Sequence, residues 1–230
     1  MASEAPLERM DAAKSPRADR VRITEIFHSL QGESKTVGLP TVFVRLTGCP
    51  LRCVYCDSEY AFHGGQWLSM DAVCDQVKSY GARHVCVTGG EPLAQFNADR
   101  LIHALADAGF IVSVETSGAM DISVLDERIV RVMDIKTPGS GEEARNRWEN
   151  LALLRPDDQI KFVICDRADY EWSRDLLWRE KLNERCEVLF SPEHEHVKPG
   201  DLADWVLADR LPVRFQIQLH KYLWGDVPGR

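Results

Sequence analysis

Short apolar runs rich in β-branched residues alternate with amphipathic stretches from Val21 onward. This alternation is typical of strands linked by helices around a parallel sheet. The apolar runs predict strands at residues 22–27, 41–47, 84–88, 110–115, 129–135, 160–165, 187–190 and 213–218. Because right-handed crossovers curl such a series, we expect an α/β fold, either an open sheet or a partial, TIM-like barrel, with ligand-binding loops at the carboxyl ends of its strands.

Helical signals fall between these runs. Ser69 can cap a helix that Gly81 stops, and Asn97 can cap a second helix that Gly109 stops. The inward-facing residues are Val73, Cys74, Val77 and Tyr80 in the first helix, and Leu101, Ile102 and Leu105 in the second. Further helical patterns cover roughly 142–154, 168–184 and 200–209.

The first twenty residues differ from the rest of the chain. They carry two Pro, four acidic and four basic residues and no periodic apolar face, so they cannot bury enough surface to offset the entropy of ordering. We expect residues 1–20 to be a mobile tail and residues 21–230 to form a single domain.

Composition and net charge exclude several classes of protein and of binding partner. Hydrophobic residues make up 44% and charged residues 28% of the 230, which excludes a largely disordered chain and a low-complexity fibre. The net charge of −8 gives no general attraction to nucleic acid or to anionic lipid, so a small ligand is favoured. No apolar run could span a bilayer, and the first twenty residues lack the apolar core of a secretory signal, which predicts a cytoplasmic protein.

Three of the seven cysteines, Cys49, Cys53 and Cys56, lie within eight residues directly after the predicted strand 41–47. This clustering indicates a metal site. A zinc site would need a fourth ligand, for which His63 or Asp57 is available. A four-iron cluster makes better use of three thiolates, because each binds one iron and the fourth iron stays open for an exogenous ligand. A ferredoxin would normally supply four cysteines per cluster.

Other polar residues follow the next predicted strands. Gly89 and Gly90 end the strand 84–88, and a turn without side chains lets a ligand approach the backbone, although a strand-to-helix turn needs glycine for structural reasons as well. Glu115 and Lys136 end later strands, where the alternative is a solvated strand end.

The Cys49-x3-Cys53-x2-Cys56 spacing, with Tyr55 before the last cysteine, resembles the signature of the radical S-adenosylmethionine (radical SAM) superfamily. The resemblance implies a radical SAM core in which the three cysteines ligate a [4Fe-4S] cluster. It also implies that the cluster's electron cleaves S-adenosylmethionine (SAM) to a 5′-deoxyadenosyl radical. The SAM-binding residues that it implies are Tyr55, Cys56, Asp57, Gly90, Glu91, Ser117, Asp134, Ile135, Lys136 and Ser191.

Two further segments, 25–34 and 216–225, together with Arg45, are similar to the 7-carboxy-7-deazaguanine synthase family over about residues 21–225. That family converts 6-carboxy-5,6,7,8-tetrahydropterin to 7-carboxy-7-deazaguanine, a ring contraction with loss of ammonia in queuosine and deazapurine biosynthesis. The resemblance implies substrate contacts at Leu30, Gln31, Gly32, Glu33, Arg45, Thr88 and His220, and a Mg²⁺ ligand at Ser58. Ser34 stands where the family commonly has glycine.

The same resemblance implies an electron donor such as a flavodoxin or ferredoxin, and a homodimer. Arg45 has a simpler interpretation as a surface charge on an edge strand. Two other functions stay open from the residues: a glycyl-radical activating enzyme, which shares the cysteine loop and the glycine turn, and a structural zinc or iron-sulfur module.

Overall fold

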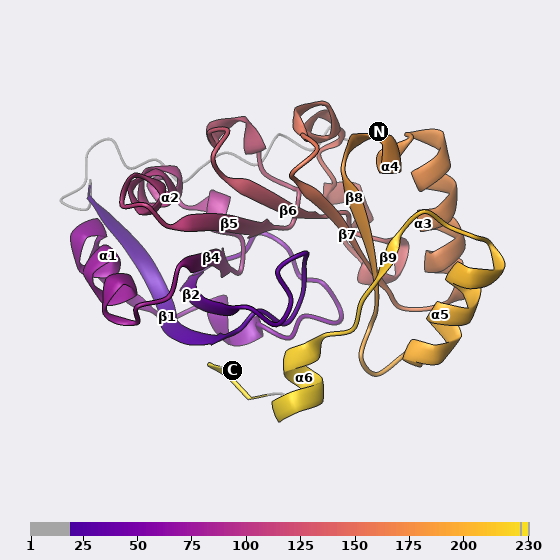
Figure 1. The fold of residues 1–230 in the computed structure, drawn as a ribbon, viewed down its shortest axis with the longest axis horizontal. Coiled ribbons are helices and arrows are strands. Elements are labelled where there is room, and N and C mark those ends of the chain that lie inside the picture. The colour runs from indigo at the N-terminus through magenta and orange to yellow at the C-terminus, as the bar shows by residue number, and fades with distance from the viewer. Residues whose placement is uncertain (1–18, 226, 230) are drawn as a thin grey trace.

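The computed structural model describes residues 19–225 and 227–229. In this part of the chain one mixed sheet has the strand order β3-β1-β2-β4-β5-β6-β7-β8-β9. The strands are β1 (Arg20–Leu30), β2 (Pro40–Leu46), β3 (Gln66–Ser69), β4 (His84–Gly89), β5 (Ile111–Thr116), β6 (Val130–Asp134), β7 (Gln159–Ile164), β8 (Glu187–Pro192) and β9 (Arg214–Phe215). The sheet does not close, so the predicted partial barrel is confirmed (Figure 1).

The sheet is parallel from β2 to β9, but β1 runs antiparallel to both β2 and β3. The predicted parallel sheet thus has one antiparallel strand, β1, near this edge. The connection between β1 and β2, residues 31–39, is shorter than the dozen or so residues that a parallel crossover requires, so it forms a hairpin instead. The short strand β3 was not predicted.

The helices are α1 (Met70–Ser79), α2 (Ala98–Asp107), α3 (Arg167–Arg179), α4 (Leu182–Arg185), α5 (Pro199–Ala208) and α6 (Leu219–Trp224). Short 3-10 helices are η1 (Glu59–Ala61), η2 (Pro92–Ala94), η3 (Ile122–Val124), η4 (Pro138–Ser140), η5 (Glu143–Arg145) and η6 (Trp148–Leu153). Ser69 caps α1 as predicted, because its Oγ accepts from Ala72 N at 3.2 Å. Asn97 precedes α2 without a side-chain cap bond; its amide donates to Arg20 O instead.

Three expectations at the level of elements were wrong. Residues 142–154 form η5 and η6 rather than one α-helix. The reason is that two side chains of this segment bond the backbone of other loops instead of facing solvent along a helix. Asn146 bonds the backbone N–H and C=O of Lys136, and Asn150 donates to the carbonyls of Gly118 and Met120. The predicted helix 168–184 divides into α3 and α4 at Lys181, whose φ is +51°. The predicted strand 213–218 pairs only at β9, and α6 follows it.

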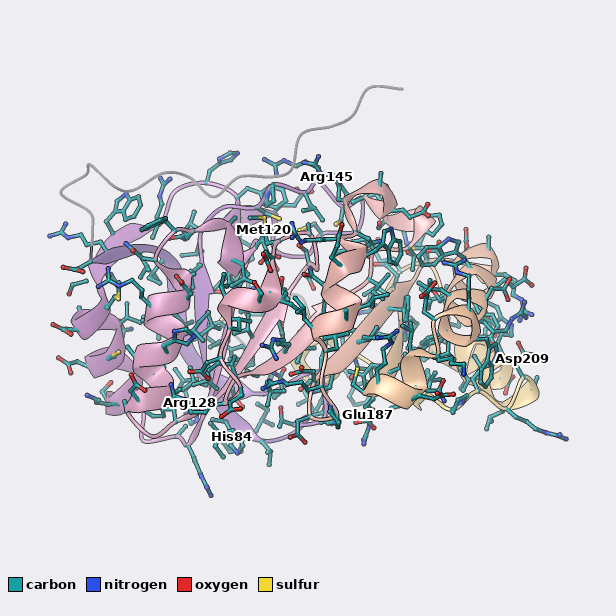
Figure 2. The ribbon with its side chains drawn as sticks, turned by 90° about the horizontal axis from the view of Figure 1, so that it is seen from above. His84, Met120, Arg128, Arg145, Glu187 and Asp209 are labelled. Atoms are coloured by element: carbon teal, nitrogen blue, oxygen red, sulfur yellow. The ribbon has the colours of Figure 1, made fainter. Side chains whose placement is uncertain are left out.

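One apolar core lies between the sheet and its helices, with Phe162, Tyr170 and Phe190 fully buried. Cys74, predicted on the inward face of its helix, is buried in the core, and Cys86 of β4 is buried as well. In Figure 2, His84 and Glu187, which begin β4 and β8, lie at one side of the molecule, and Met120, which follows β5, lies toward the opposite side. No helix within residues 19–225 or 227–229 is long and apolar enough to cross a membrane.

Of residues 1–20, the structure describes only Asp19 and Arg20. Arg20 begins β1, and Asp19 O accepts from Met70 N at 3.2 Å, so both residues contact the folded domain. The rest of the expected tail lies outside the described residues.

Candidate active site

A cavity of about 390 Å³ lies at the carboxyl ends of the parallel strands, between the β1–β2 loop, the loop after β2 and the C-terminal segment. Most of the residues predicted for a site line it: Leu30, Gln31, Gly32, Glu33, Arg45, Cys49, Cys53, Tyr55, Cys56, Asp57, Ser58, Thr88, Gly90, Ser117, Asp134, Lys136 and His220. Glu91, Ile135 and Ser191 are buried outside its wall. Residues far apart in the sequence thus share one pocket.

The loop after β2 presents three free, partly exposed thiols to the cavity, Cys49, Cys53 and Cys56. Burial raises the pKa of Cys49 to about 11 and also raises the pKa values of Cys53 and Cys56. The thiols therefore hold their protons near neutral pH and must release them on binding a metal.

The chemistry of this donor set fits a [4Fe-4S] cluster. Among the residues that the structure describes, no three His, Cys, Asp or Glu side chains converge on one metal-ion position. A four-iron cluster does not need such convergence, because each thiolate binds a different iron. Two hydrogen bonds anchor the loop to the segment after β6. Val54 N donates to Ser140 O at 3.1 Å, and Arg52 N donates to Glu142 Oε1 at 2.6 Å.

The glycine turn after β4 packs directly against the cysteine loop. A Cβ atom at Gly90 would lie 2.3 Å from Gly48 O and 2.7 Å from Cys49 Cβ, so only glycine fits this contact. Glu91 N donates to Gly48 O at 2.8 Å and fastens the two segments together. The turn therefore sets the position of the first cysteine.

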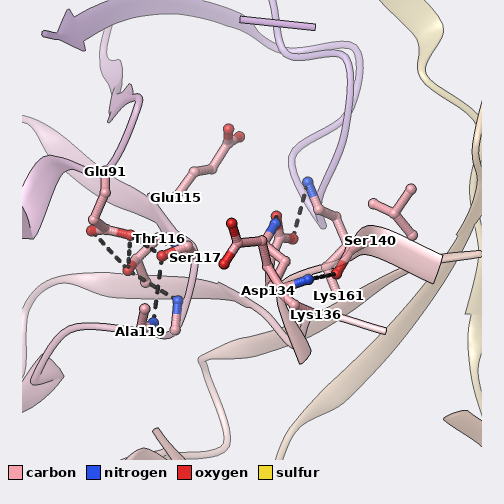
Figure 3. Close-up of polar contacts among 12 residues, drawn as sticks. Glu91, Glu115, Thr116, Ser117, Ala119, Asp134, Lys136, Ser140 and Lys161 are labelled. Atoms are coloured by element: carbon pink, nitrogen blue, oxygen red, sulfur yellow. Dashed lines mark hydrogen bonds and ion pairs between the residues drawn. The ribbon is translucent and has the colours of Figure 1, made fainter. Parts of the chain in front are cut away.

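Glu91 lies beneath this turn and is fully buried. Its carboxylate accepts hydrogen bonds from Ser117 N at 2.7 Å, from Thr116 Oγ1 at 2.9 Å and from Leu93 N at 2.9 Å (Figure 3). Burial raises the pKa of Glu91 although these donors lower it. The side chain thus joins the carboxyl ends of β4 and β5 and does not face the cavity; a SAM contact by Glu91 stays a prediction.

Asp134 and Lys136 extend from the end of β6 into the cavity beside Lys161 of β7 (Figure 3). Lys136 Nζ lies 2.9 Å from Asp134 Oδ2. Burial opposes both charges, but the two lysines hold the pKa of Asp134 below its ordinary value, and Asp134 and Tyr55 raise the pKa of Lys136. Ile135, between them, points into the core. This side of the cavity is therefore ionised and close to the cysteine loop.

Arg45 points into the cavity and not to bulk solvent, and its orientation depends on a β-bulge. The β1–β2 register shifts between Ile23 and Glu25, which brings Glu25 opposite Arg45. Glu25 Oε1 accepts from Arg45 Nε and from Tyr60 OH, each at 2.8 Å. Burial opposes the charge of Arg45, but Tyr60 and Glu25 outweigh it and raise the Arg45 pKa.

The guanidinium of Arg45 also lies over two rings. Its Cζ is 5.9 Å from the Phe27 ring centre and 5.7 Å from the Tyr60 ring centre. Its Nη1 donates to Ser58 Oγ at 3.4 Å, and within the described chain no side chain bonds Nη2. Arg45 is therefore a fixed cation with a donor directed at the cavity.

Gln31 and Thr88 meet at the carboxylate of Glu115, near the end of β5. Gln31 Nε2 donates to Glu115 Oε1 at 3.2 Å, and Thr88 Oγ1 donates to Glu115 Oε2 at 3.3 Å. Nearby, a Cβ atom at Gly32 would lie 2.1 Å from His220 Nδ1, and Leu219 N donates to Gly32 O at 3.0 Å. The C-terminal segment thus packs on the backbone of the β1–β2 loop.

Ser34 stands in the left-handed region, with φ +70°. This conformation explains why glycine suits the position, and Ser34 keeps it through bonds from its N to Gln216 Oε1 at 2.9 Å and between its Oγ and Thr36 Oγ1 at 2.9 Å. The substitution therefore leaves the loop closed against the C-terminal segment.

Ser58, the expected Mg²⁺ ligand, donates to Asp57 Oδ1 at 2.8 Å. Lys221 Nζ lies 3.4 Å from Asp57 Oδ2. Burial opposes the charge of Asp57, but Lys221 and Ser58 lower its pKa. A hydroxyl and an ionised carboxylate are suitable hard donors, and Mg²⁺ keeps several waters, so the pair can contribute to such a site.

Six further residues that were not predicted as individual contacts line the cavity or bond residues of its wall: Glu25, Phe27, Tyr60, Lys161, Gln218 and Lys221. Lys161 carried a signal, because a lysine within the apolar run Ile160–Ile164 is unusual for a buried strand. Ser191, predicted at the end of β8, is covered, and Glu193 faces the cavity instead.

Comparisons with known proteins agree with this geometry. The model of the radical SAM superfamily matches residues 43–136, which include the cysteine loop, the glycine turn and Asp134–Lys136. The crystal structure of QueE from Escherichia coli superposes with a TM-score of 0.67 over 90% of this chain and 100% of that chain, at 22% identity. This likeness shows the fold alone.

Sequence relatives are closer. The 7-carboxy-7-deazaguanine synthase of Koribacter versatilis is 43% identical over 219 residues, covering 89% of this chain and 97% of the relative. That of Chlorobaculum tepidum is 41% identical over 208 residues, covering 89% of this chain and 94% of the relative. The chain therefore belongs to the 7-carboxy-7-deazaguanine synthase family, within the radical SAM superfamily.

Proposed function

We propose that the protein is a lyase that converts 6-carboxy-5,6,7,8-tetrahydropterin to 7-carboxy-7-deazaguanine by radical ring contraction with loss of ammonia. The observation that carries the proposal is one cavity walled by three thiols on one side and by Arg45, Gln31 and Thr88 on another. Both halves of such a reaction need to meet in one enclosed space, because a radical must reach its substrate directly.

Cys49, Cys53 and Cys56 would hold the [4Fe-4S] cluster, which supplies the electron that cleaves bound SAM. Gly90 contributes to the cavity wall, and Ser117 is held by Glu91 at the next strand end. Together with Asp134 and Lys136, these groups offer charged and polar partners to the amino, carboxylate and ribose groups of SAM. They would orient the cofactor toward the pterin.

On the substrate side, Arg45 binds the carboxylate of the pterin. Glu25 holds its Nε, so the guanidinium cannot turn away from the cavity. Glu115, held by Gln31 and Thr88, offers carboxylate oxygens to the N–H groups of the pterin edge. Arg45 would thus recognise the carboxylate of the pterin, and Glu115 would recognise the N–H groups of its ring.

Ser58 would contribute a Mg²⁺ ligand beside the substrate. Arg45 and Lys221 lie close to the Asp57–Ser58 pair and oppose a bound cation. The substrate carboxylate would offset their charge, so we expect Mg²⁺ to bind only together with the pterin.

The finer assignments of location and partners are part of the same proposal. We infer a cytoplasmic enzyme that acts as a homodimer and takes electrons from a flavodoxin or ferredoxin, on the basis of the resemblance and of the acidic composition. Light scattering with size-exclusion chromatography, and reduction of the cluster by each carrier, test these points.

The other functions receive less support. A glycyl-radical activating enzyme would share the cysteine loop. Because this chain belongs to the 7-carboxy-7-deazaguanine synthase family, that function is not favoured. A structural zinc or iron-sulfur module would not need a charged cavity beside its metal. No separate observation favours either of them.

The deciding experiment is anaerobic turnover of reconstituted protein with the carboxylated tetrahydropterin, SAM and dithionite, followed by mass spectrometry. We expect a product with the mass of 7-carboxy-7-deazaguanine and release of ammonia. Formation of 5′-deoxyadenosine without that product would refute the substrate assignment.

Variants separate the cluster from the substrate. Cys49→Ala, Cys53→Ala and Cys56→Ala should lose iron or abolish cleavage of SAM, because no thiolate replaces the missing ligand. Cys74→Ala, on the buried face of α1, should keep both. Full turnover by Cys53→Ala would contradict the assignment.

A further inference from the structure

A buried lysine links two walls of the cavity. Lys161 extends from the middle of β7, and its Nζ lies 2.5 Å from Glu33 Oε2 and 3.2 Å from Asp134 Oδ1. Burial opposes the ammonium charge, but Asp134 and Glu33 outweigh burial and raise the pKa of Lys161 well above its ordinary value. Lys161 is therefore a cation shared between two carboxylates.

These carboxylates belong to the two sides of the proposed site. Asp134 ends β6 next to Lys136 and lies on the side assigned to SAM. Glu33 lies in the β1–β2 loop, on the side assigned to the pterin. Its second oxygen, Oε1, accepts from Gln218 Nε2 at 2.9 Å, which adds the C-terminal segment to the same contact. One ammonium group thus joins three separate parts of the chain.

The two carboxylates differ in how far they depend on Lys161 for a cationic partner. Asp134 has a second cation in Lys136, whereas within the described residues Glu33 has no cationic partner other than Lys161. A carboxylate taken from water needs such a partner. Loss of the lysine would therefore leave Asp134 paired but would leave Glu33, in the loop that carries Gln31, with Gln218 as its remaining side-chain donor and without a cation.

We propose that Lys161 is a positioning residue that couples the binding of SAM to the binding of the pterin. SAM, by fixing Asp134 and Lys136, fixes the ammonium group, which then holds Glu33 and its loop in the form that receives the pterin. The inference rests on the proposed function, since it takes these two molecules as the ligands. Because coupling is reciprocal, each ligand strengthens the binding of the other by the same factor.

The test measures affinity without turnover. Cluster-loaded protein, kept oxidised so that SAM stays intact, is titrated anaerobically with the fluorescent analogue 6-carboxypterin, with and without saturating SAM. We expect SAM to tighten binding about fivefold or more in the wild-type protein, the lower end of typical coupling. In Lys161→Met the ratio of the two dissociation constants should fall to about one, because the link between the two sites is lost.

Three variants make this result specific. Lys161→Arg keeps the charge and should restore coupling. Glu33→Gln breaks the link from the other side and should abolish it, which also serves if Lys161→Met does not fold. Lys78→Met, which removes an exposed ion pair with Asp75 on α1, should match the wild type.

If the protein turns over the carboxylated tetrahydropterin, two outcomes overturn this inference and leave the proposed function standing. The first is a ratio of the two dissociation constants equal to one in the wild type. The second is a ratio that stays at the wild-type value in both Lys161→Met and Glu33→Gln. If the wild type neither binds 6-carboxypterin nor makes the product, the proposed function fails and the inference fails with it. A loss of melting temperature with unchanged coupling would assign Lys161 a purely structural role.

Discussion

Arg45 shows how a single side chain acquires a defined direction. Arginine is usually exposed to solvent, and the neighbours of Arg45 on β2, Val44 and Leu46, are fully buried on the opposite face. Glu25 and the two aromatic rings instead hold the guanidinium over the cavity. A fixed cation loses little conformational entropy when an anion binds, which favours affinity.

We expect Arg45→Ala to weaken binding of 6-carboxypterin by about 2 to 5 kcal/mol, the usual loss when one partner of an enclosed charge pair is removed. Glu25 would stay behind as an unpaired carboxylate and repel the ligand's own acid group. Binding of pterin without a carboxylate should change little. Fluorescence titration of both ligands measures the difference, and iron content is determined on the same preparation.

Arg100→Ala is the matched control, because Arg100 lies exposed on α2 and pairs with Asp19 far from the cavity. It should bind 6-carboxypterin like the wild type. Equal losses for both pterins in Arg45→Ala would contradict the carboxylate assignment, and loss of iron would mean that Arg45 supports the cysteine loop.

At the scale of elements, the site depends on contacts between turns that leave no room for a side chain. The β4–η2 turn and the cysteine loop approach so closely that their backbones share a hydrogen bond between Glu91 N and Gly48 O. The two segments therefore behave as one unit, and a disturbance of either moves the first thiol.

Gly90→Ala should accordingly destabilise the protein by about 1 to 3 kcal/mol, as overpacking does, and lower the iron content after reconstitution. The reason is that the new Cβ would have to displace Gly48 or Cys49. Gly200→Ala provides the comparison, since Gly200 lies in α5 with no atom within 4 Å of an added Cβ. Denaturant unfolding and iron analysis of both variants decide the point; equal iron contents would show that the cysteine loop adapts.

The elements that could be predicted from sequence are those with a strong local pattern. The strands β2, β4 to β8, the helices α1, α2 and α5, and the clustering of Cys49, Cys53 and Cys56 all follow from short-range periodicity or spacing. The failures have long-range causes. Asn146 and Asn150 bond backbone groups of distant loops, and no periodicity within 142–154 records this.

The same distinction applies to the site. Most of the motif residues line the cavity, because strand ends of a parallel sheet meet at one edge. The pairs Lys161–Glu33 and Arg45–Glu25 could not be read from the sequence, because the first joins residues 128 positions apart and the second depends on a one-residue bulge. Glu91 and Ser191 reach the correct region but face the interior.

At the scale of the whole molecule, the described chain begins with a residue that is held in place. Asp19 O accepts from Met70 N, and its carboxylate pairs with Arg100. These contacts join Asp19 to α1 and α2 at the edge of the sheet.

Deletion of residues 2–18 should therefore leave turnover and melting temperature nearly unchanged, because this segment lacks the apolar periodicity needed to bury surface. Deletion of residues 2–22 should lower the melting temperature, since it also removes Asp19 and the buried Val21 of β1. Calorimetry and the anaerobic assay compare the two proteins. A large loss in the shorter deletion would show that the segment contributes to the fold.

Because His220 packs on Gly32, this part of the cavity wall can form only late in translation, when the C-terminal segment has been made. The cysteine loop leaves the ribosome well before segment 216–221, and at about 5 to 20 residues per second the interval is on the order of ten seconds. For that time the nascent chain displays its thiols without the wall that His220 and Gln218 complete. Delivery of iron and sulfide to the growing chain would thus meet an open loop, whereas delivery after release has to pass the finished cavity.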